Sequence, residues 1–454
     1  MNDKRPKTEE TSAAMGEGEA LENRREEFDT SAAVCEPEDQ TKLMEVILDV
    51  ENLKRAYKKV VKNGGAPGVD GLTTDDLKAY LAVNWNRIRK ELLSGTYKPK
   101  PVKRVEIPKP GGGTRKLGIP TVLDRFIQQA IHQVLQSRWD KTFSEYSFGF
   151  RPGRSAHQAV EQAREYIRAG HRYVVDLDLE KFFDRVNHDI LMDRVAKRVT
   201  DKRLLKVLRA YLNAGILENG LVQATEEGVP QGGPLSPLLS NLMLDELDRE
   251  LENRKLHYVR YADDCNIYVA SERAGQRVME SITNFLSKRL RLRVNKEKSA
   301  VGKPSKRRFL GFSFALGVEP KIRLADQSKE RFKRRIRELT RPTKGRSLEQ
   351  VIRGTRRYLI GWHGYFRLCQ TPSVFTHLDQ WIRRRLRCYL WRQWRRGRTR
   401  YRELTKRGVL PRTAAAVAGS PKGPWRLSKS PPLAHAIPNE FLYALGLPRL
   451  GSAA

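Results

Sequence analysis

The turn Tyr261-Ala262-Asp263-Asp264 constrains this chain more than any other feature of its sequence. It lies between two short apolar runs, residues 257–260 and 266–269, which predict strands. Taken alone, two adjacent acids in such a turn most often mark a plain surface turn. A second acidic strand end gives the pair more weight, because the apolar run 173–178 also finishes in an aspartate, Asp178.

Aspartates at strand ends are explained by a bound divalent cation. A lone buried charge is costly, so packing alone does not place Asp178 at the end of a buried strand. Mg²⁺ takes carboxylate and phosphate oxygens as ligands, and two such ions about 4 Å apart can drive phosphoryl transfer. Asp178, Asp263 and Asp264 are therefore candidate metal ligands, although the strand end and the turn are each weak evidence when taken alone. Asp176, on the same strand face, is a secondary candidate.

The net charge of +34 over 454 residues points to a polyanionic partner, either nucleic acid or an anionic membrane surface. Residues 1–40 differ from the rest, with twelve acids against five bases and too few apolar residues to fold alone. We find no apolar run of about 18 residues that predicts a membrane span and no amphipathic anchor. Nucleic acid is therefore the favoured partner, no membrane association is expected, and a cytoplasmic location is predicted.

Hydrophobic periodicity predicts a chain that mixes helices and strands. Helices are expected within 41–100, around a glycine-rich loop at 63–71, with Thr73 or Thr74 capping the second helix. A hairpin is expected over 102–119, and the chain beyond about residue 325 reads as helical. The cysteines are widely spaced and form no CxxC pair, so free thiols are expected rather than a zinc site: Cys35, Cys265, Cys369 and Cys388.

Three further motifs gain meaning only together. Phe183 follows Asp178 by five residues and could floor a sugar pocket, although core packing explains it equally well. The Gln231-Gly232-Gly233 loop allows close backbone approach to a ligand, although a tight turn into a helix is an adequate explanation. Lys109 and Arg115 flank the hairpin tip and could clamp a triphosphate, although a solvated turn is the simpler interpretation.

The order of these features resembles the reverse transcriptase family, and specifically the group II intron reverse transcriptase/maturases. Five sequence motifs match those of that subfamily: residues 148–155, 229–237, 261–264, 297–299 and 361–366. The resemblance covers about residues 42–430, nearly everything outside the acidic lead. It implies an α+β right-hand polymerase of fingers, palm and thumb with an antiparallel palm sheet, followed by helical regions.

The resemblance also implies residue roles. Asp178, Asp263 and Asp264 would hold two Mg²⁺ ions, with Mn²⁺ as an alternative and the Leu179 carbonyl as a further ligand. Phe183 would block a ribose 2′-hydroxyl. The nucleotide-binding positions would be Lys109, Arg115, Phe183, Gln231, Gly232 and Lys298, and the nucleic-acid-binding positions would include Arg151, Arg154, Arg383, Arg384, Arg387, Arg395 and Arg396.

The C-terminal part is strongly basic, since residues 381–407 contain twelve Lys or Arg and one acid, with aromatic residues interleaved. Arginines neutralise phosphates and aromatic rings stack on bases, whereas a solvated charged helix is the alternative. We predict an acidic disordered extension (1–40), fingers and palm (41–320), a thumb or maturase X region (321–380) and a DNA-binding region (381–454). The resemblance is to members without an HNH endonuclease, best known with group IIC introns.

The expected partners are an intron RNA, target DNA, an RNA template with a DNA primer, and dNTPs. Splicing assistance and target-primed insertion would follow, with nucleoid association on target DNA in a bacterial cytoplasm. Two alternatives stay open: an RNA-binding splicing scaffold without polymerase activity, and a host-adopted reverse transcriptase. The retained acids favour an enzyme over a scaffold, and the 361–366 block with the basic tail favours an intron protein over a host-adopted one.

Overall fold

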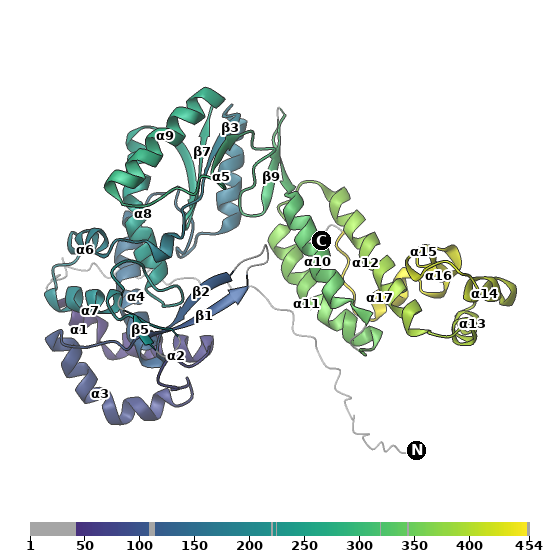
Figure 1. Ribbon diagram of the computed structural model, residues 1–454, viewed down its shortest axis with the longest axis horizontal. Coiled ribbons are helices and arrows are strands. Elements are labelled where there is room, and N and C mark those ends of the chain that lie inside the picture. Colours follow the sequence, from purple (N-terminus) through teal and green to yellow (C-terminus); the bar gives the residue numbers. More distant parts are fainter. Residues whose placement is uncertain are drawn as a thin grey trace, which may run out of the picture. The chain divides into compact units, whose positions relative to one another are not determined.

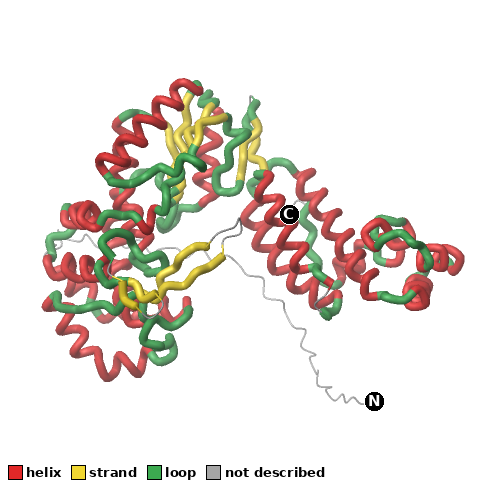
Figure 2. Tube along the Cα trace, in the orientation of Figure 1, coloured by secondary structure: helices red, strands yellow, loops and turns green. Residues whose placement is uncertain are grey.

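The computed structural model describes residues 42–108, 114–218, 221–223, 225–317, 319–342 and 345–451 (Figure 1). The expected acidic extension, Cys35 and Lys109 lie outside these residues. Residues 40–454 form one unit in which helices and strands are mixed along the chain (Figure 2). No helix within the described ranges combines the length and the apolar character needed to cross a bilayer.

The first helices pack on one another, and they lie before and after the predicted glycine loop in the chain. They are α1 (Leu43–Ile47), α2 (Val50–Asn63), α3 (Leu77–Ser94) and α4 (Val122–Trp139). Asp49 caps α2 by accepting from the amides of Glu51 and Asn52. The capping prediction for α3 was wrong: Asp76 is the N-cap residue, and the amide and hydroxyl of Thr73 donate to its carboxylate.

The predicted hairpin is confirmed as β1 (Val102–Pro108) and β2 (Thr114–Ile119), paired antiparallel from Lys103–Ile119 to Pro108–Thr114. The short strands β4 (Ile216–Glu218) and β5 (Leu221–Gln223) extend this sheet in the order β2-β1-β4-β5. Before them come α5 (Ala156–Arg168), α6 (His188–Ala196) and α7 (Lys202–Leu212).

The central sheet has the strand order β6-β7-β3-β8, with every neighbouring pair antiparallel. Its strands are β6 (His257–Tyr261), β7 (Asp264–Val269), β3 (Tyr173–Leu177) and β8 (Ala300–Gly302). The predicted strands around 262–264 are thereby confirmed, and each extends closer to the turn than expected. Three helices contact the sheet: α5, α8 (Ser236–Asn253) and α9 (Glu272–Arg289).

Alternating side chains of the central sheet join two different hydrophobic cores. Val175, Leu177 and Ile267 belong to the core formed with α8 and the N-terminal helices. Val174 and Tyr268, one residue along each strand, belong to the core that contains the C-terminal helices. The polar residues at the strand ends extend this second face, and they form the site described below.

The C-terminal part is helical, as predicted, after a two-stranded sheet of β9 (Phe312–Ala315) and β10 (Lys321–Leu324). The helices are α10 (Asp326–Leu339), α11 (Leu348–Phe366), α12 (Pro372–Gln393), α13 (Gly397–Lys406), α14 (Pro411–Ala418), α15 (Pro424–Leu427), α16 (Pro431–Ala436) and α17 (Asn439–Ala444). Ile382, Leu386, Leu390 and Trp394 are buried, so the basic segment also has an apolar face. Cys265, Cys369 and Cys388 are free and buried, as expected.

Candidate active site and nucleotide pocket

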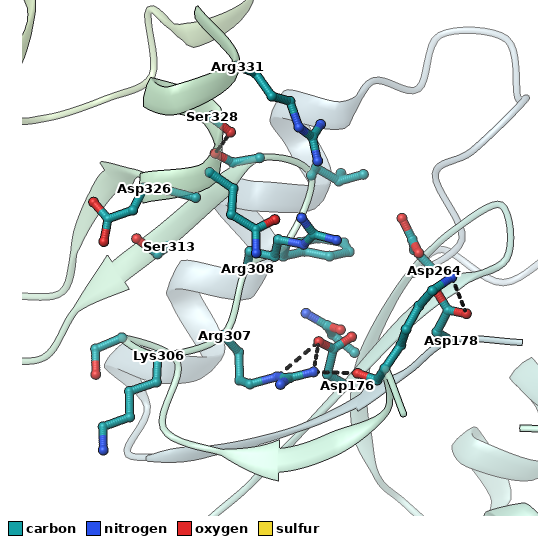
Figure 3. Close-up of a pocket in the computed structure, with 18 residues that line it drawn as sticks. Asp176, Asp178, Asp264, Lys306, Arg307, Arg308, Ser313, Asp326, Ser328 and Arg331 are labelled. Carbon is teal, nitrogen blue, oxygen red and sulfur yellow. Dashed lines mark hydrogen bonds and ion pairs between the residues drawn. The ribbon is translucent and has the colours of Figure 1, made fainter. Parts of the chain in front are cut away.

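Asp178 and Asp264 lie on neighbouring strands at one end of the central sheet. The register pairs Asp176 with Asn266 and Leu177 with Cys265, so Asp178 comes opposite Asp264. Directly opposite residues of an antiparallel pair point to the same face. Both carboxylates line a pocket of about 570 Å³, together with Asp176 and Asn266 (Figure 3).

Asp263 lies in the tight turn that joins β6 to β7. Tyr261 pairs with Asp264, which leaves Ala262 and Asp263 as a two-residue loop. Ala262 has a φ of 57°, a left-handed conformation that costs a residue with a Cβ about 1 kcal/mol or more. The turn therefore needs support from its surroundings to keep this shape.

The acids of this site repel one another. Burial, followed by the charges of Asp263, Asp178 and Asp176, raises the pKa of Asp264 to about 7, although its own side chain still faces the open pocket. Burial and Asp178 likewise raise the pKa of Asp263, while Arg115 and Lys298 oppose the rise. Lys298 lies with its Nζ 3.4 Å from the Asp178 carboxylate. This half-exposed contact offsets little of the excess negative charge.

The donor set suits a hard divalent cation, because the carboxylates of Asp178, Asp263 and Asp264 lie close enough together that their charges raise the pKa values of Asp263 and Asp264 despite the cationic side chains nearby. Within the described ranges, however, no three His, Cys, Asp or Glu side chains already stand as a closed ligand cluster. An Mg²⁺ site of the polymerase kind is open in this way, since substrate phosphates and water complete it.

Asp176 is held by partners that sequence reasoning did not find. Arg307 donates to its Oδ2 from Nε at 3.0 Å and from Nη2 at 2.6 Å. The same Nη2 donates to the Lys298 carbonyl at 2.7 Å. The secondary acid is thus tied to the segment that carries Lys298. No local pattern in the sequence indicates this pairing.

Four of the predicted nucleotide-binding residues line a second cavity of about 420 Å³: Arg115, Phe183, Gln231 and Gly232. Arg115 Nε donates to Gln231 Oε1 at 2.7 Å. Phe183 lies in a short 3-10 helix, Phe182–Asp184, and its side chain is buried. Lys298 lines the carboxylate pocket instead.

The glycine loop after α2 borders this second cavity. Asn63 and Gly64 line it, and Arg125 of α4 donates to the carbonyls of Gly64 at 3.0 Å and Ala66 at 2.8 Å. A Cβ on Gly65 would come within 2.7 Å of the Arg125 guanidinium. The sequence motifs did not point to Arg125.

The arginines predicted to contact nucleic acid comprise an exposed pair, one buried residue and four partly buried residues. Arg395 and Arg396 are exposed beyond the end of α12. Arg151 is buried, with its guanidinium on the Asp140 carboxylate and on the carbonyls of Ser144 and Ser147.

The remaining arginines are partly buried with internal partners. Arg154 donates to the Glu145 carbonyl. Arg384 stacks 3.9 Å from the Trp425 ring, and Arg387 donates to the Ile437 carbonyl at 2.8 Å. Arg383 donates to the Tyr443 hydroxyl at 2.5 Å.

Two protein families match this chain. Residues 107–314 match the reverse transcriptase (RNA-dependent DNA polymerase) family. Residues 329–408 match the maturase-specific domain of group II introns. The chain belongs to the group II intron reverse transcriptase/maturase family. Its polymerase domain is an RNA-dependent DNA polymerase domain, and the expected right-hand α+β fold with an antiparallel palm sheet is confirmed.

Several relatives of this reverse transcriptase are known. It is 36% identical over 300 residues to Protein YkfC of Escherichia coli (strain K12), which covers 57% of this chain and 79% of that protein. It is 29% identical over 357 residues to the group II intron-encoded protein LtrA of Lactococcus lactis subsp. cremoris, with 64% and 59% covered.

A third relative is the putative COX1/OXI3 intron 2 protein of Saccharomyces cerevisiae, which is 29% identical over 343 residues, with 62% of this chain and 39% of that protein covered. This reverse transcriptase therefore spans less than two thirds of the length of both intron-encoded relatives.

Proposed function

We propose that the protein extends a DNA primer with deoxynucleotides while copying RNA, and that it binds the RNA of its own intron. One observation carries the first part: the acidic turn lies next to the second cavity. Gly149 lies against Ala262 of the turn, and the following residue, Phe150, lines that cavity together with Arg115. The charge of Arg115 also opposes the rise in the pKa of Asp263. A nucleotide in the cavity would thus have its triphosphate beside the carboxylates.

Carboxylates would bind the metal ions, and cationic side chains would bind the triphosphate. Asp178, Asp263 and Asp264 would hold Mg²⁺, with the Leu179 carbonyl as a further oxygen. Bound Mg²⁺ would lower the pKa of the primer 3′-hydroxyl and stabilise the leaving pyrophosphate. Arg115 and Lys109 would bind the triphosphate, and Lys298 would neutralise charge near the pyrophosphate.

The second cavity would set sugar and template position. The ring of Phe183 would close the space that a ribose 2′-hydroxyl needs, so deoxynucleotides would be preferred. Gln231 is held by Arg115, and Gly232 has a φ of 125°, where a Cβ would come within 2.4 Å of the Gly118 carbonyl oxygen. The backbone of this loop can therefore approach a base pair closely.

Intron RNA binding is supported by the maturase-specific match at 329–408 and by the intron-encoded relatives. The net charge of +34 supplies the electrostatic attraction that RNA and target DNA require. We propose that splicing assistance and target-primed copying of the intron follow from these two activities.

Primer extension with the purified protein, on poly(rA) annealed to oligo(dT), tests the polymerase proposal. Asp263→Ala and the isosteric Asp264→Asn should each lower dTTP incorporation by on the order of 1,000-fold, because each removes a metal ligand worth several kcal/mol. Asp189→Asn, an exposed acid of α6, is the matched control and should leave incorporation unchanged. Robust synthesis by either active-site variant would remove the turn from the active site.

The main rival is an RNA-binding splicing scaffold, which the maturase match also favours. Filter binding of intron RNA separates the two functions. Under our proposal Asp263→Ala binds the RNA as tightly as the unaltered protein while losing synthesis. Intron binding by an unaltered protein that does not extend primers would instead support the scaffold.

A further inference from the structure

A fully buried ion pair lies directly behind the acidic turn. Arg260 of β6 and Asp248 of α8 have no exposed side-chain surface, and Arg260 donates to Asp248 from Nε at 2.7 Å and from Nη2 at 2.5 Å. Arg260 belongs to the face of the central sheet that packs on α8, opposite the face that carries the metal-binding carboxylates. The pair is therefore too deep to contact a substrate.

Stability alone does not account for this pair. Removing two charges from water is so costly that a well-packed apolar pair of similar volume is often equally stable or more stable. A guanidinium offers something an apolar side chain cannot, namely five N–H donors in a fixed plane. The remaining donor group of Arg260, Nη1, has two further acceptors: the Asn241 Oδ1 at 3.1 Å and the Ala262 carbonyl at 2.9 Å.

Hydrogen bonds and one close backbone contact link Arg260, Asn241, Gly149 and Ala262 in a closed ring beside the turn. Asn241, on the same helix as Asp248, donates from Nδ2 to the Gly149 carbonyl at 2.9 Å. Gly149 lies against the turn so closely that a Cβ there would come within 2.2 Å of the Ala262 amide nitrogen. The backbone of Arg260 also pairs with the 146–148 segment, since Phe148 N donates to its carbonyl at 2.8 Å.

The ring meets the turn at its strained residue. Ala262 adopts a left-handed conformation that favours glycine, and such a conformation persists only where the surroundings determine it. The carbonyl of Ala262 begins the peptide that leads to Asp263. Fixing that carbonyl therefore fixes the direction in which the Asp263 and Asp264 side chains leave the backbone.

We propose that Arg260, oriented by Asp248 and Asn241, is a positioning residue that holds the 261–264 turn in its metal-binding shape. The inference rests on the proposed polymerase function for its effect on catalysis. It predicts that the chain folds without the charged pair but loses the geometry of its carboxylates.

The test uses the full-length chain with Arg260→Met and Asp248→Leu combined, and separately with Arg260→Lys. Five quantities are measured: melting temperature, hydrogen exchange of the 261–265 amides, Mn²⁺ affinity by water-proton relaxation, kcat for primer extension, and affinity for an RNA–DNA hybrid. The apolar pair should melt near the unaltered protein, while the turn amides exchange roughly tenfold faster. Mn²⁺ affinity should drop, and kcat should fall by about 100-fold because the reacting groups are misplaced. Affinity for the RNA–DNA hybrid should not change.

Arg260→Lys keeps the charge, but its three N–H groups sit on one nitrogen and cannot replace the planar guanidinium that spans Asp248, Asn241 and Ala262, so it should share the loss of kcat. Leu204→Ala, in the buried face of α7, is the control for a general loss of stability: it should melt early yet keep Mn²⁺ affinity and kcat. If the double variant unfolds, Asn241→Leu breaks the ring while retaining the ion pair, and its turn amides should still exchange faster.

Protected turn amides together with Mn²⁺ affinity within about twofold of the unaltered protein, in a folded double variant, would overturn the positioning role. Failure of the unaltered protein to extend primers would instead sink the proposed function, and the exchange and Mn²⁺ measurements would still decide the role of Arg260.

Discussion

Phe183 illustrates how one residue can serve the core and the substrate at once. Its ring packs 5.2 Å from that of Phe182, and its backbone carbonyl accepts from the Val229 amide at 2.7 Å. The same side chain lines the cavity that also contains Arg115 and Gln231. A change at this position therefore acts on stability and on sugar selection together.

We expect Phe183→Ala to raise the kcat/KM for ribonucleotides relative to deoxynucleotides by about 10- to 100-fold, because the space for a 2′-hydroxyl opens. The same change should lower the free energy of unfolding by about 3 kcal/mol. Primer extension with paired rNTP and dNTP titrations measures the ratio. Phe183→Leu, which keeps most of the bulk, is the control, and unchanged rejection of ribonucleotides by the alanine variant would remove Phe183 as the gate.

The buried side chain of His132 leads to a prediction about how the stability of the protein depends on pH. Burial, with a smaller contribution from Lys59, lowers its pKa to about 4, and its Nδ1 has no hydrogen-bond partner among the described residues. The unfolded chain takes up a proton near the ordinary pKa of 6.5, before the folded protein does, so stability is lost as the pH falls.

Between pH 7 and pH 5 this histidine should cost about 2 kcal/mol of unfolding free energy. Urea unfolding of the protein and of His132→Leu at both pH values isolates its share. Equal losses in both proteins would show that His132 does not titrate in this way.

At the scale of elements, α12 and the residues just after it contain arginines with internal partners and arginines that are exposed. Arg384 and Arg387 donate to carbonyls of Trp425 and Ile437, and they thereby tie α12 to the following helices. Arg395 and Arg396, just beyond the helix, are exposed. Charge density alone does not distinguish these roles.

Replacing Arg395 and Arg396 by Gln should reduce the salt dependence of binding to duplex nucleic acid by about 2 in log–log slope, with no change in melting temperature. Replacing Arg384 and Arg387 by Gln should instead lower stability by about 1–3 kcal/mol for each lost charged hydrogen bond. Binding isotherms at several salt concentrations and thermal melts measure both effects. The opposite pattern would assign the nucleic-acid contact to Arg384 and Arg387.

At the scale of the whole molecule, the second core crosses the predicted domain boundary near residue 320. Val259 and Tyr268 of the central sheet share this core with helices of the C-terminal part. Phe312 lies with its ring centroid 5.1 Å from that of Phe366 in α11. The polymerase region and the helices after it therefore depend on each other for burial.

A chain ending at residue 320 should consequently melt on the order of 10 °C below the full chain, because several large apolar side chains lose their cover. Differential scanning calorimetry of both chains provides the comparison. A truncated chain that melts at the same temperature would show that the polymerase region folds independently.

Much of this architecture could be predicted because it depends on local pattern. Short apolar runs indicated the strands around Asp178 and Asp264, and turn residues indicated the hairpin that carries Arg115. The contacts of Arg125, Arg307 and Arg260 could not be predicted in this way. Each joins elements that lie far apart in the sequence, and nothing near an arginine in the chain shows which distant carbonyl or carboxylate it will meet.

The close contact between Gly149 and Ala262 has a consequence for engineering. Two sequence blocks that read as separate motifs are one piece of folded backbone, with Gly149 on one side and the acidic turn on the other. Chimeras assembled from related proteins should therefore exchange residues 146–149 and 260–264 as a matched set. A junction placed anywhere between them would bring together two surfaces that were never fitted to each other.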